Sequence, residues 1–366
     1  MAEWRKRGEF SRSRRARQRR AMRLETLEPR LLLSADVAGT LDIPGETDRY
    51  TFSLDRDTQL YFDALSADPS ISWSLSGPRG AEVSGRGFAF SDSAGIGENP
   101  VLDLRAGDYT LTVDGLQEAT GAYAFRLLDV QAEAVGITPG VVVAGTLDPG
   151  NETDAYVFSA AAGDRFYFDA QDVSGSAYWR LLDPYGGVVF GPTPSYWDVD
   201  VLTLEASGSY TLLLEGWVYS STPESYAFNV DPRGHTDPPP LTGTVISIGS
   251  TVNGTLASAG QPDDYIFTLA GPARLYFDSF TADSNLYWSL VGPRGAEVSS
   301  QLFLYSDSNF LGGNPILDLV AGTYQVSVSG GATGAYAFRL LDVQAEAVGL
   351  TPGTVVSGTL DPGNQT

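Results

Sequence analysis

The sequence predicts an all-β protein built from tandem antiparallel β-sandwiches, and three observations support this. The phrase Gly-Thr-Leu begins at residues 39, 145, 254 and 358, so it recurs 106, 109 and 104 residues apart, which is the size of one small domain. Within each repeat, apolar and polar residues alternate with the period of two that half-buried strands show. Gly and Pro turns separate these stretches, and no helical period appears after residue 36. Such units are typical of sandwiches.

The predicted elements follow the same order in each repeat: an alternating strand, an aromatic strand, a tryptophan strand, a turn, a hairpin and a closing strand. In the turn, Pro presets one dihedral and Gly accepts positive φ. In the first repeat these elements cover residues 50–54, 60–63, 73–75, 77–80, 102–113 and 123–125. The tryptophans of the third element, Trp73, Trp179 and Trp288, alternate with leucines. We therefore expect all three in the core.

The repeats divide the chain into five predicted segments. These are a basic segment at 1–36, sandwich repeats at 37–130, 141–232 and 250–343, and the start of a fourth repeat at 354–366. Residues 121–153 and 334–366 differ at only four of 33 positions, so the duplicated element is a pair of repeats. Residues 238–240 are three prolines, which favour an extended, stiff spacer. Because the fourth repeat stops early, we expect the natural protein to be longer.

Charge is unevenly distributed. Residues 1–36 hold 11 of the 23 Lys and Arg residues and five acids, so the remainder carries 12 bases, 40 acids and a net charge of -28. An acidic surface of this size repels nucleic acid and anionic lipid. We expect no nucleic-acid partner and, because no apolar run approaches the ~18 residues of a membrane span, no transmembrane segment. The basic segment itself is too poor in apolar residues to pack, so we expect it to be disordered or at most a short helix.

The residues needed for catalysis are sparse. The chain has no cysteine, which excludes disulfides, thiolate metal sites and cysteine nucleophiles. Its single histidine, His235, lies in a segment that reads as a linker, whereas a catalytic triad needs a base held on a rigid scaffold. We therefore predict a non-enzymatic protein and a solvated linker histidine.

The basic N-terminal segment contains Leu27, Glu28, Pro29, Arg30, Leu32 and Leu33. At these residues it resembles the LEPR-XLL motif found at the start of very large exported repeat proteins of Gram-negative bacteria. The basic residues before the motif and the repeats directly after it agree with this resemblance. It implies export of a multi-domain protein to the extracellular space or cell surface, with the export machinery recognising the N-terminus or a C-terminal signal beyond residue 366. A nucleic-acid-binding arm is the competing interpretation of the arginines.

Each repeat has the order Gly-x-Leu, Asp-x-Tyr-x-Phe, a glycine turn, Ala-Gly-x-Tyr and a final Gly-x-Tyr-x-Phe. In this order the repeats resemble the bacterial pre-peptidase C-terminal domain, and the resemblance covers residues 37–343 in three copies. It implies a jelly-roll-like β-sandwich of the kind found beside secreted proteases and in long surface proteins. The third copy departs from the pattern, because Asp264 directly precedes Tyr265 whereas Asp48 and Asp154 stand two residues before their tyrosines.

Calcium is the one metal for which the sequence offers candidate ligands. Six aspartates recur at shared positions and could supply oxygen ligands: Asp48, Asp63, Asp154, Asp169, Asp264 and Asp278. No dense loop of the Asp-x-Asp-x-Asp-Gly type is present. The alternative is that these side chains face outward on strands or cap turns. Apart from calcium, we expect no cofactor.

Trp197 and Trp217 occur only in the second repeat, beside Tyr196 and Tyr219. They are candidates for a surface that stacks on a sugar or contacts a protein, and local variation of core packing is the alternative. Taken together, these patterns predict a non-catalytic stalk, spacer or adhesin segment whose partners are an extracellular glycan or protein. The second hypothesis is that the repeats are accessory modules of a secreted hydrolase whose catalytic domain lies beyond residue 366.

Overall fold

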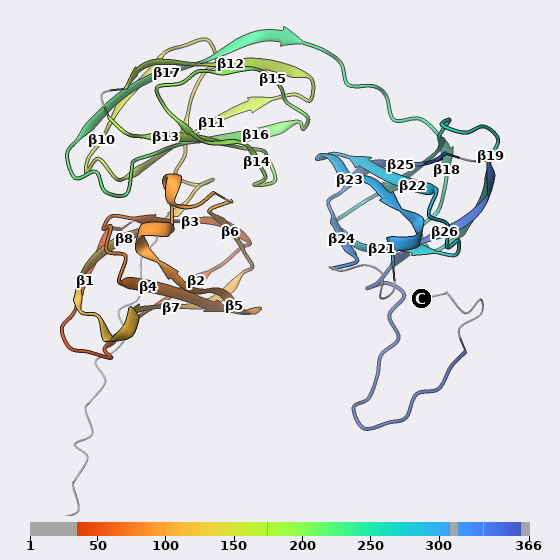
Figure 1. The fold of residues 1–366 in the computed structure, drawn as a ribbon, viewed down its shortest axis with the longest axis horizontal. Coiled ribbons are helices and arrows are strands. Elements are labelled where there is room, and N and C mark those ends of the chain that lie inside the picture. The colour runs from red at the N-terminus through yellow and green to blue at the C-terminus, as the bar shows by residue number, and fades with distance from the viewer. Residues whose placement is uncertain (1–34, 98, 174, 308–313, 332, 360–366) are drawn as a thin grey trace, which may run out of the picture.

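The computed structural model describes residues 35–359 except 98, 174, 308–313 and 332. It contains three antiparallel β-sandwiches in tandem (Figure 1), which confirms the predicted fold class. The described part has no α-helix and four short 3-10 helices: η1 (Phe88–Phe90), η2 (Ser93–Gly95), η3 (Leu116–Glu118) and η4 (Phe303–Tyr305). All six residues matched to the export motif lie outside the described residues, and so do the last seven residues of the predicted fourth repeat.

The first sandwich has eight strands in two four-stranded sheets. One sheet has the order β1 (Val37–Leu41), β8 (Gly121–Asp129), β3 (Thr58–Ala64) and β6 (Val101–Leu104). The other has the order β2 (Thr47–Leu54), β7 (Gly107–Gly115), β4 (Ile71–Gly77) and β5 (Gly80–Gly87). The chain enters each sheet in turn and returns beside its first strand, which is the strand order of a jelly roll. The predicted turn at 77–80 joins β4 to β5, with Gly80 at a φ of 96°.

The second sandwich repeats this order and adds a strand. Its first sheet is β10 (Val143–Leu147), β17 (Glu224–His235), β12 (Asp164–Val173) and β15 (Val199–Thr203). Its second sheet is β14 (Val188–Pro194), β13 (Tyr178–Leu182), β16 (Gly208–Glu215), β11 (Thr153–Ala160) and β9 (Val135–Gly136). The added strand β9 pairs in parallel with β11 and comes from residues that the sequence placed between repeats.

The third sandwich has the same plan. Its first sheet is β19 (Thr251–Leu256), β26 (Gly334–Asp342), β21 (Ala273–Ser279) and β24 (Ile316–Leu319). Its second sheet is β18 (Thr244–Val245), β20 (Asp263–Leu269), β25 (Gly322–Gly330), β22 (Leu286–Gly292) and β23 (Gly295–Leu302). Strand β18 again pairs in parallel with the strand that follows it in the sheet.

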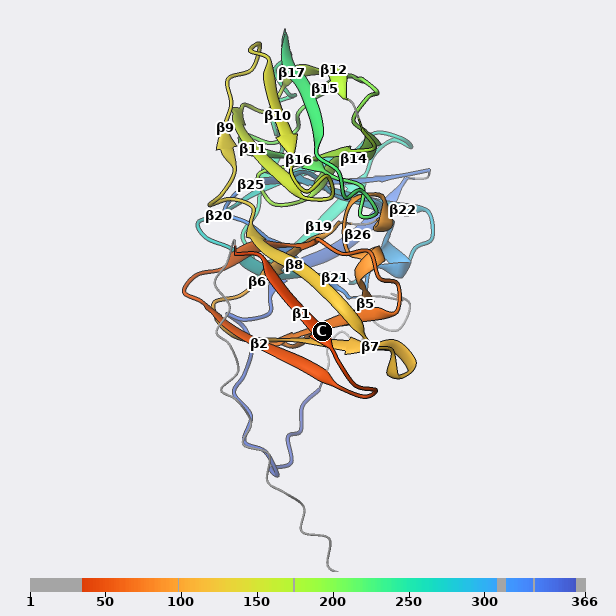
Figure 2. The same ribbon diagram turned by 90° about the vertical axis from the view of Figure 1, so that its left-hand side faces the viewer.

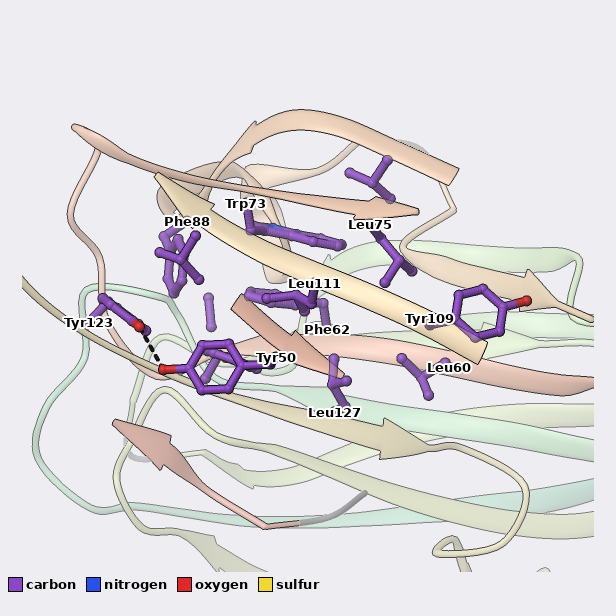
Figure 3. Packing of buried hydrophobic residues seen from close by; sticks show 14 of the residues in the cluster. Tyr50, Leu60, Phe62, Trp73, Leu75, Phe88, Tyr109, Leu111, Tyr123 and Leu127 are labelled. Carbon is purple, nitrogen blue, oxygen red and sulfur yellow. Dashed lines mark hydrogen bonds between the residues drawn. The ribbon is translucent and has the colours of Figure 1, made fainter. Parts of the chain in front are cut away.

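Each sandwich encloses its own aromatic core. In the first, Trp73 is 1% exposed and stacks on Phe62 with ring centroids 4.0 Å apart (Figure 3). The third core repeats the stack with Trp288 on Phe277 at 3.9 Å, and Trp179 of the second is fully buried. The core positions predicted for the three tryptophans are therefore confirmed.

Packing requires the glycine of the recurring Gly-Thr-Leu sequence. A Cβ atom on Gly39 would lie 2.3 Å from the hydroxyl oxygen of Tyr123, a distance that real Cβ atoms do not reach. Gly145 and Gly254 stand equally close to the matching tyrosines, Tyr226 and Tyr336. Only glycine lets the tyrosine of the closing strand lie flat over the opening strand. The glycine of each Gly-Thr-Leu sequence is therefore required by a close contact between the opening strand and the tyrosine of the closing strand.

The first two sandwiches lie directly against each other, whereas the third follows an extended connection (Figures 1 and 2). The outer face of the β1-β8-β3-β6 sheet packs on the β13, β16 and β11 strands of the second sandwich. Residues 232–240, which contain the three prolines, are exposed. The contact between the first two sandwiches is the most elaborate polar structure in the described chain.

Candidate functional site

The contact between the first and second sandwiches is lined by apolar side chains from both. We call it the joint. Its apolar members are Tyr61, Val101, Leu128 and Val130 of the first sandwich and Ala155, Leu182 and Leu213 of the second. Val218, from a loop of the second sandwich, packs into the core of the first. Most of these residues point outward on their own sandwich, and the other sandwich covers them.

A fully buried ion pair lies inside the joint. Arg180 and Glu215 of the second sandwich are both 0% exposed, and the guanidinium Nε lies 3.2 Å from a carboxylate oxygen of Glu215. Tyr61 of the first sandwich donates its hydroxyl to the same carboxylate at 2.9 Å. Arg180 also donates to the carbonyl oxygens of Ser93 and Ile96 at 3.1 and 3.3 Å. Both partners of the ion pair are therefore bonded across the joint as well as to each other.

A second polar cluster surrounds Asp63, which is also fully buried. Arg126 donates to Oδ2 at 2.8 Å, and the Thr153 hydroxyl donates to Oδ1 at 2.9 Å. The backbone N–H of Thr153 donates to Oδ2 at 3.2 Å, and the Asn151 amide reaches the carbonyl of Ala64 at 3.3 Å. Asp63, one of the six calcium candidates, is thus enclosed by the start of the second sandwich. Its oxygens are used in joining the two units.

Asp92 lies at the edge of this network and is 1% exposed. Its Oδ2 accepts the backbone N–H of Ala64 at 2.6 Å, whereas its Oδ1 has no hydrogen-bond partner among the described residues. Burial, and next the negative charge of Asp63, raise the pKa of the Asp92 carboxyl well above its ordinary value. The folded protein therefore keeps the Asp92 carboxyl protonated to higher pH than the unfolded chain does.

The raised pKa of Asp92 makes stability depend on pH, and one substitution should remove part of this dependence. Because the folded carboxyl binds its proton more tightly than the unfolded one, stability falls as pH rises from about 3.9 through the raised pKa of Asp92. Asp92→Asn mimics the protonated side chain, so we expect the variant to lose part of this fall. Urea unfolding between pH 4 and pH 8 measures it, with exposed Asp42→Asn as the control. An unchanged pH slope in Asp92→Asn would contradict the assignment.

A different set of aspartates caps a pair of tyrosines in each sandwich. Tyr123 donates to Asp48 at 2.5 Å, and its hydroxyl lies 2.6 Å from that of Tyr50 (Figure 3). The second sandwich has the same bond from Tyr226 to Asp154. In the third, Tyr336 donates to Asp263 at 2.6 Å.

The third sandwich therefore corrects the alignment made from sequence. Asp263, not Asp264, occupies the position of Asp48 and Asp154, because the closing tyrosine, Tyr336, donates its hydroxyl to Asp263. Asp264 instead accepts a hydrogen bond from the hydroxyl of Ser327 at 2.6 Å.

The remaining two calcium candidates have different surroundings. Asp278 is fully buried and paired with Arg339 at 2.8 Å, as Asp63 is with Arg126. Asp169 is partly exposed and accepts the amide of Gln171 at 2.9 Å. Among the described residues, no three His, Cys, Asp or Glu side chains are grouped closely enough to hold a metal ion. Calcium binding stays a prediction.

The aromatic residues specific to the second sandwich are on its surface. Trp197 is 57% exposed and Trp217 is 41% exposed, so neither is a variation of core packing. Each forms an aromatic pair with its neighbour: Tyr196 with Trp197 at 5.7 Å between ring centroids, and Trp217 with Tyr219 at 5.2 Å. Trp217 is next to Val218 and therefore lies beside the joint.

His235 is exposed, as predicted for a solvated side chain, but it is not in an irregular linker. It ends strand β17, where Nδ1 lies 2.8 Å from Asp164 and Nε2 lies 2.9 Å from Asp237. These two carboxylates, first Asp237 and then Asp164, raise the pKa of the imidazole. Both ring nitrogens are used in these pairs, so His235 has no nitrogen left to activate a nucleophile.

A cavity of about 970 Å³ lies where side chains of the three sandwiches meet. Four arginines line it: Arg79, Arg105, Arg274 and Arg294. Each is paired within its own sandwich, with Glu82, Asp57, Asp318 and Glu297 respectively. Since these acids neutralise the arginines, the cavity does not present a positive site for an anion.

Comparison with known proteins gives no family. No protein-family model matches the chain, and no curated protein matches it. Among solved structures, the chain is similar to the CUB1-EGF-CUB2 domains of rat MASP-1, with 10% identity and a TM-score of 0.20 over 54% of this chain and 98% of that one. The corresponding human MASP-1/3 domains share 11% sequence identity at a TM-score of 0.16, and the match covers 54% of this chain and 94% of theirs. Lac15 from a marine microbial metagenome shares 8% sequence identity at a TM-score of 0.17, and the match covers 83% of this chain and 88% of Lac15. Scores this low carry no argument about function.

Proposed function

We propose that this chain is a non-catalytic, extracellular repeat array of a large exported bacterial protein, in which sandwiches act as spacers that present other parts of the protein. The joint is the observation that carries this proposal. A buried Arg180–Glu215 pair with hydrogen bonds to both sandwiches fixes the angle between two units. A stalk needs fixed angles between its units, and these buried carboxylates are held by arginines within the contact.

The joint also accounts for acidic residues that could otherwise be taken for catalytic groups. Asp63 and Glu215 are paired with arginines inside the contact, and the aspartates of the tyrosine caps are bonded to hydroxyls. Within the described residues, no helix is long and apolar enough to cross a membrane. The net charge of the repeats keeps such an array soluble and separated from anionic surfaces.

The alternative is that these are accessory modules, of the pre-peptidase C-terminal type, of a secreted hydrolase. Protease, esterase and glycosidase assays on the purified chain test the proposal, and we expect no turnover above that of buffer. Turnover that disappears on one Asp or Glu substitution would overturn the spacer role. A catalytic domain in the same polypeptide would favour the accessory role, and further repeats would favour the spacer role.

The resemblance of the N-terminal segment to an export motif leads to a separate prediction. Deleting residues 1–36 should retain the protein in the cell and leave its melting temperature unchanged, because the sandwich strands begin at Val37. Fractionation of the native host and calorimetry of the purified deletion variant measure the two effects. Normal delivery of the deletion variant to the cell surface would contradict an export role.

A binding role for the second sandwich is favoured by one specific observation, the two exposed aromatic pairs. Exposed rings stack on sugar faces and anchor protein contacts. We predict that Trp197→Ala together with Trp217→Ala leaves stability within about 1 kcal/mol, because both rings are on the surface, and abolishes any binding to glycan arrays or host cells. Exposed Tyr287→Ala in the third sandwich is the control. Binding that survives the double substitution would exclude this surface.

A further inference from the structure

The joint side of the first sandwich recurs residue by residue in the third. In the first, Tyr61 lies opposite Leu128 and Val101 in register, and Asp63 lies opposite Arg126. In the third, the same registers pair Tyr276 with Leu341 and Ile316, and Asp278 with Arg339. The two ion pairs have the same length, 2.8 Å. The third sandwich thus carries the same outer face, on strands β21, β24 and β26. We call it the second docking face.

The second docking face is more exposed than its counterpart. Val101, Leu128 and Val130 are 7, 5 and 0% exposed under the second sandwich. The equivalent residues Ile316, Leu341 and Val343 are all partly exposed. Aliphatic side chains left partly exposed around a buried ion pair lack some of the burial that stabilises the joint.

The corresponding face of the second sandwich keeps the tyrosine and the aspartate but not their aliphatic and arginine partners. On strands β12 and β17, Tyr167 lies opposite Asp231, and Asp169 lies opposite Asn229. Asp231 therefore replaces the aliphatic Leu128 of the first sandwich, and the uncharged Asn229 replaces the cation Arg126. The hydroxyl of Tyr167 donates to Asp198 within its own unit at 2.5 Å. Only the first and third sandwiches carry the docking face among the described residues.

The surface that receives the docking face belongs to the second sandwich alone. Its β13 and β16 strands place Arg180 opposite Leu213. In the first sandwich the same register pairs Ser74 with Thr112, and in the third it pairs Ser289 with Ser327. Contact between sandwiches is therefore heterologous, in the sense that one kind of surface binds another. Neither the first nor the third sandwich can serve as the partner of the second docking face.

The connection that follows the third sandwich also matches the joint. Residues 334–366 repeat residues 121–153 at 29 of 33 positions. The repeat includes Asn364 and Thr366, which correspond in sequence to Asn151 and Thr153. Asn151 and Thr153 are the residues that bond to Ala64 and Asp63 of the first sandwich. The connection thus has the sequence that leads a second-type sandwich onto a docking face.

We propose that the second docking face binds a further β-sandwich of the second sandwich's type, one that presents a buried Arg-Glu pair ringed by aliphatic side chains and follows the 334–366 connection. A second copy of this chain fits less well, because its own first sandwich already covers its receiving surface. Sandwiches would then alternate in fixed pairs separated by proline spacers. The proposal concerns assembly alone and holds whether or not the array is catalytic.

The test lengthens the full chain with its own second sandwich. Because residue 366 corresponds to residue 153, a copy of residues 154–242 is appended directly after Thr366. The chain has no cysteine, so two can be introduced for spin labels. Spin labels at Ser84→Cys and Ser159→Cys, which are both exposed, measure the distance across the joint. Labels at Ser299→Cys and at the appended copy of Ser159→Cys measure the distance across the new contact.

We expect the two label pairs to give narrow distance distributions with the same mean. Leu341→Glu should broaden only the second distribution, whereas Val291→Glu, a charge on the opposite sheet of the same sandwich, should leave it narrow. Leu341→Glu in the chain of 366 residues should keep the melting temperature of the third sandwich, which shows that the variant folds. A broad second distribution without any substitution would overturn the proposal. So would concentration-dependent dimers that Leu341→Glu abolishes, because a second copy would then be the partner.

Discussion

Replacing Arg180 by Leu should lower the free energy of unfolding of the paired sandwiches by about 3–5 kcal/mol. Arg180 and Glu215 are both fully buried, so the substitution leaves a carboxylate in the joint without its cation. It also removes the donor to the carbonyl oxygens of Ser93 and Ile96, which hold the first sandwich in place. Urea unfolding of the whole chain, followed by tryptophan fluorescence, measures the loss.

A surface pair provides the matched control. Arg233 is 49% exposed and lies 2.6 Å from Asp231, so Arg233→Leu should cost no more than about 1 kcal/mol. The double variant Arg180→Leu with Glu215→Leu should recover part of the loss, because an apolar pair of similar volume carries no unpaired charge. If Arg180→Leu costs as little as Arg233→Leu, the joint does not hold the two sandwiches together.

The jelly roll was predictable because its signals are local. The alternation of apolar and polar residues along 50–54 indicates which face of that strand is buried. Pro and Gly at 77–80 indicate where the chain turns. Trp73, Trp179 and Trp288 recur at one strand position, and all three are in the cores. Such features need no knowledge of what lies beyond the sandwich.

The joint was not predicted, because the alternation of apolar and polar residues along a strand shows only which side of that strand faces the core of its own sandwich. It does not show whether a second sandwich covers the other side. Asp63 points away from its own core, so from sequence it was assigned as an outward-facing residue or a calcium ligand. A signal was nevertheless present in the differences between repeats. Outward positions that hold Ser74 and Thr112 in the first repeat hold Arg180 and Leu213 in the second. An outward position that holds a small polar residue in one copy and a leucine in the next, as Thr112 and Leu213 do, indicates a partner.

The tyrosine caps show a limit of alignment by motif. Asp264 was chosen because it directly precedes Tyr265, but the hydrogen bond from Tyr336 goes to Asp263. A side chain on a strand points to one face or the other according to parity, so a shift of one residue changes its surroundings completely. Spacing from the tyrosine was the better guide, because Asp48 and Asp263 both stand two residues before it.

The joint and the proline spacer together predict that the chain melts in two steps. The first two sandwiches share buried groups and should unfold as one cooperative block. The third follows the exposed residues 232–240 and meets the second through surface side chains, such as Arg294 over the ring of Tyr185 at 6.0 Å. It should therefore unfold separately, and scanning calorimetry should resolve both transitions.

Truncating a core tryptophan in each block tests this division. Trp288 is 3% exposed and stacked on Phe277, so Trp288→Ala should cost about 3–5 kcal/mol in the third sandwich alone. For a domain of this size, the loss corresponds to a fall in melting temperature on the order of 10 °C or more. Trp73→Ala should lower the other transition by a similar amount, because its stack on Phe62 has the same geometry. Exposed Trp197→Ala should move neither transition. If Trp288→Ala lowered both transitions together, the third sandwich would belong to the same rigid block, and the proline segment would not act as a spacer.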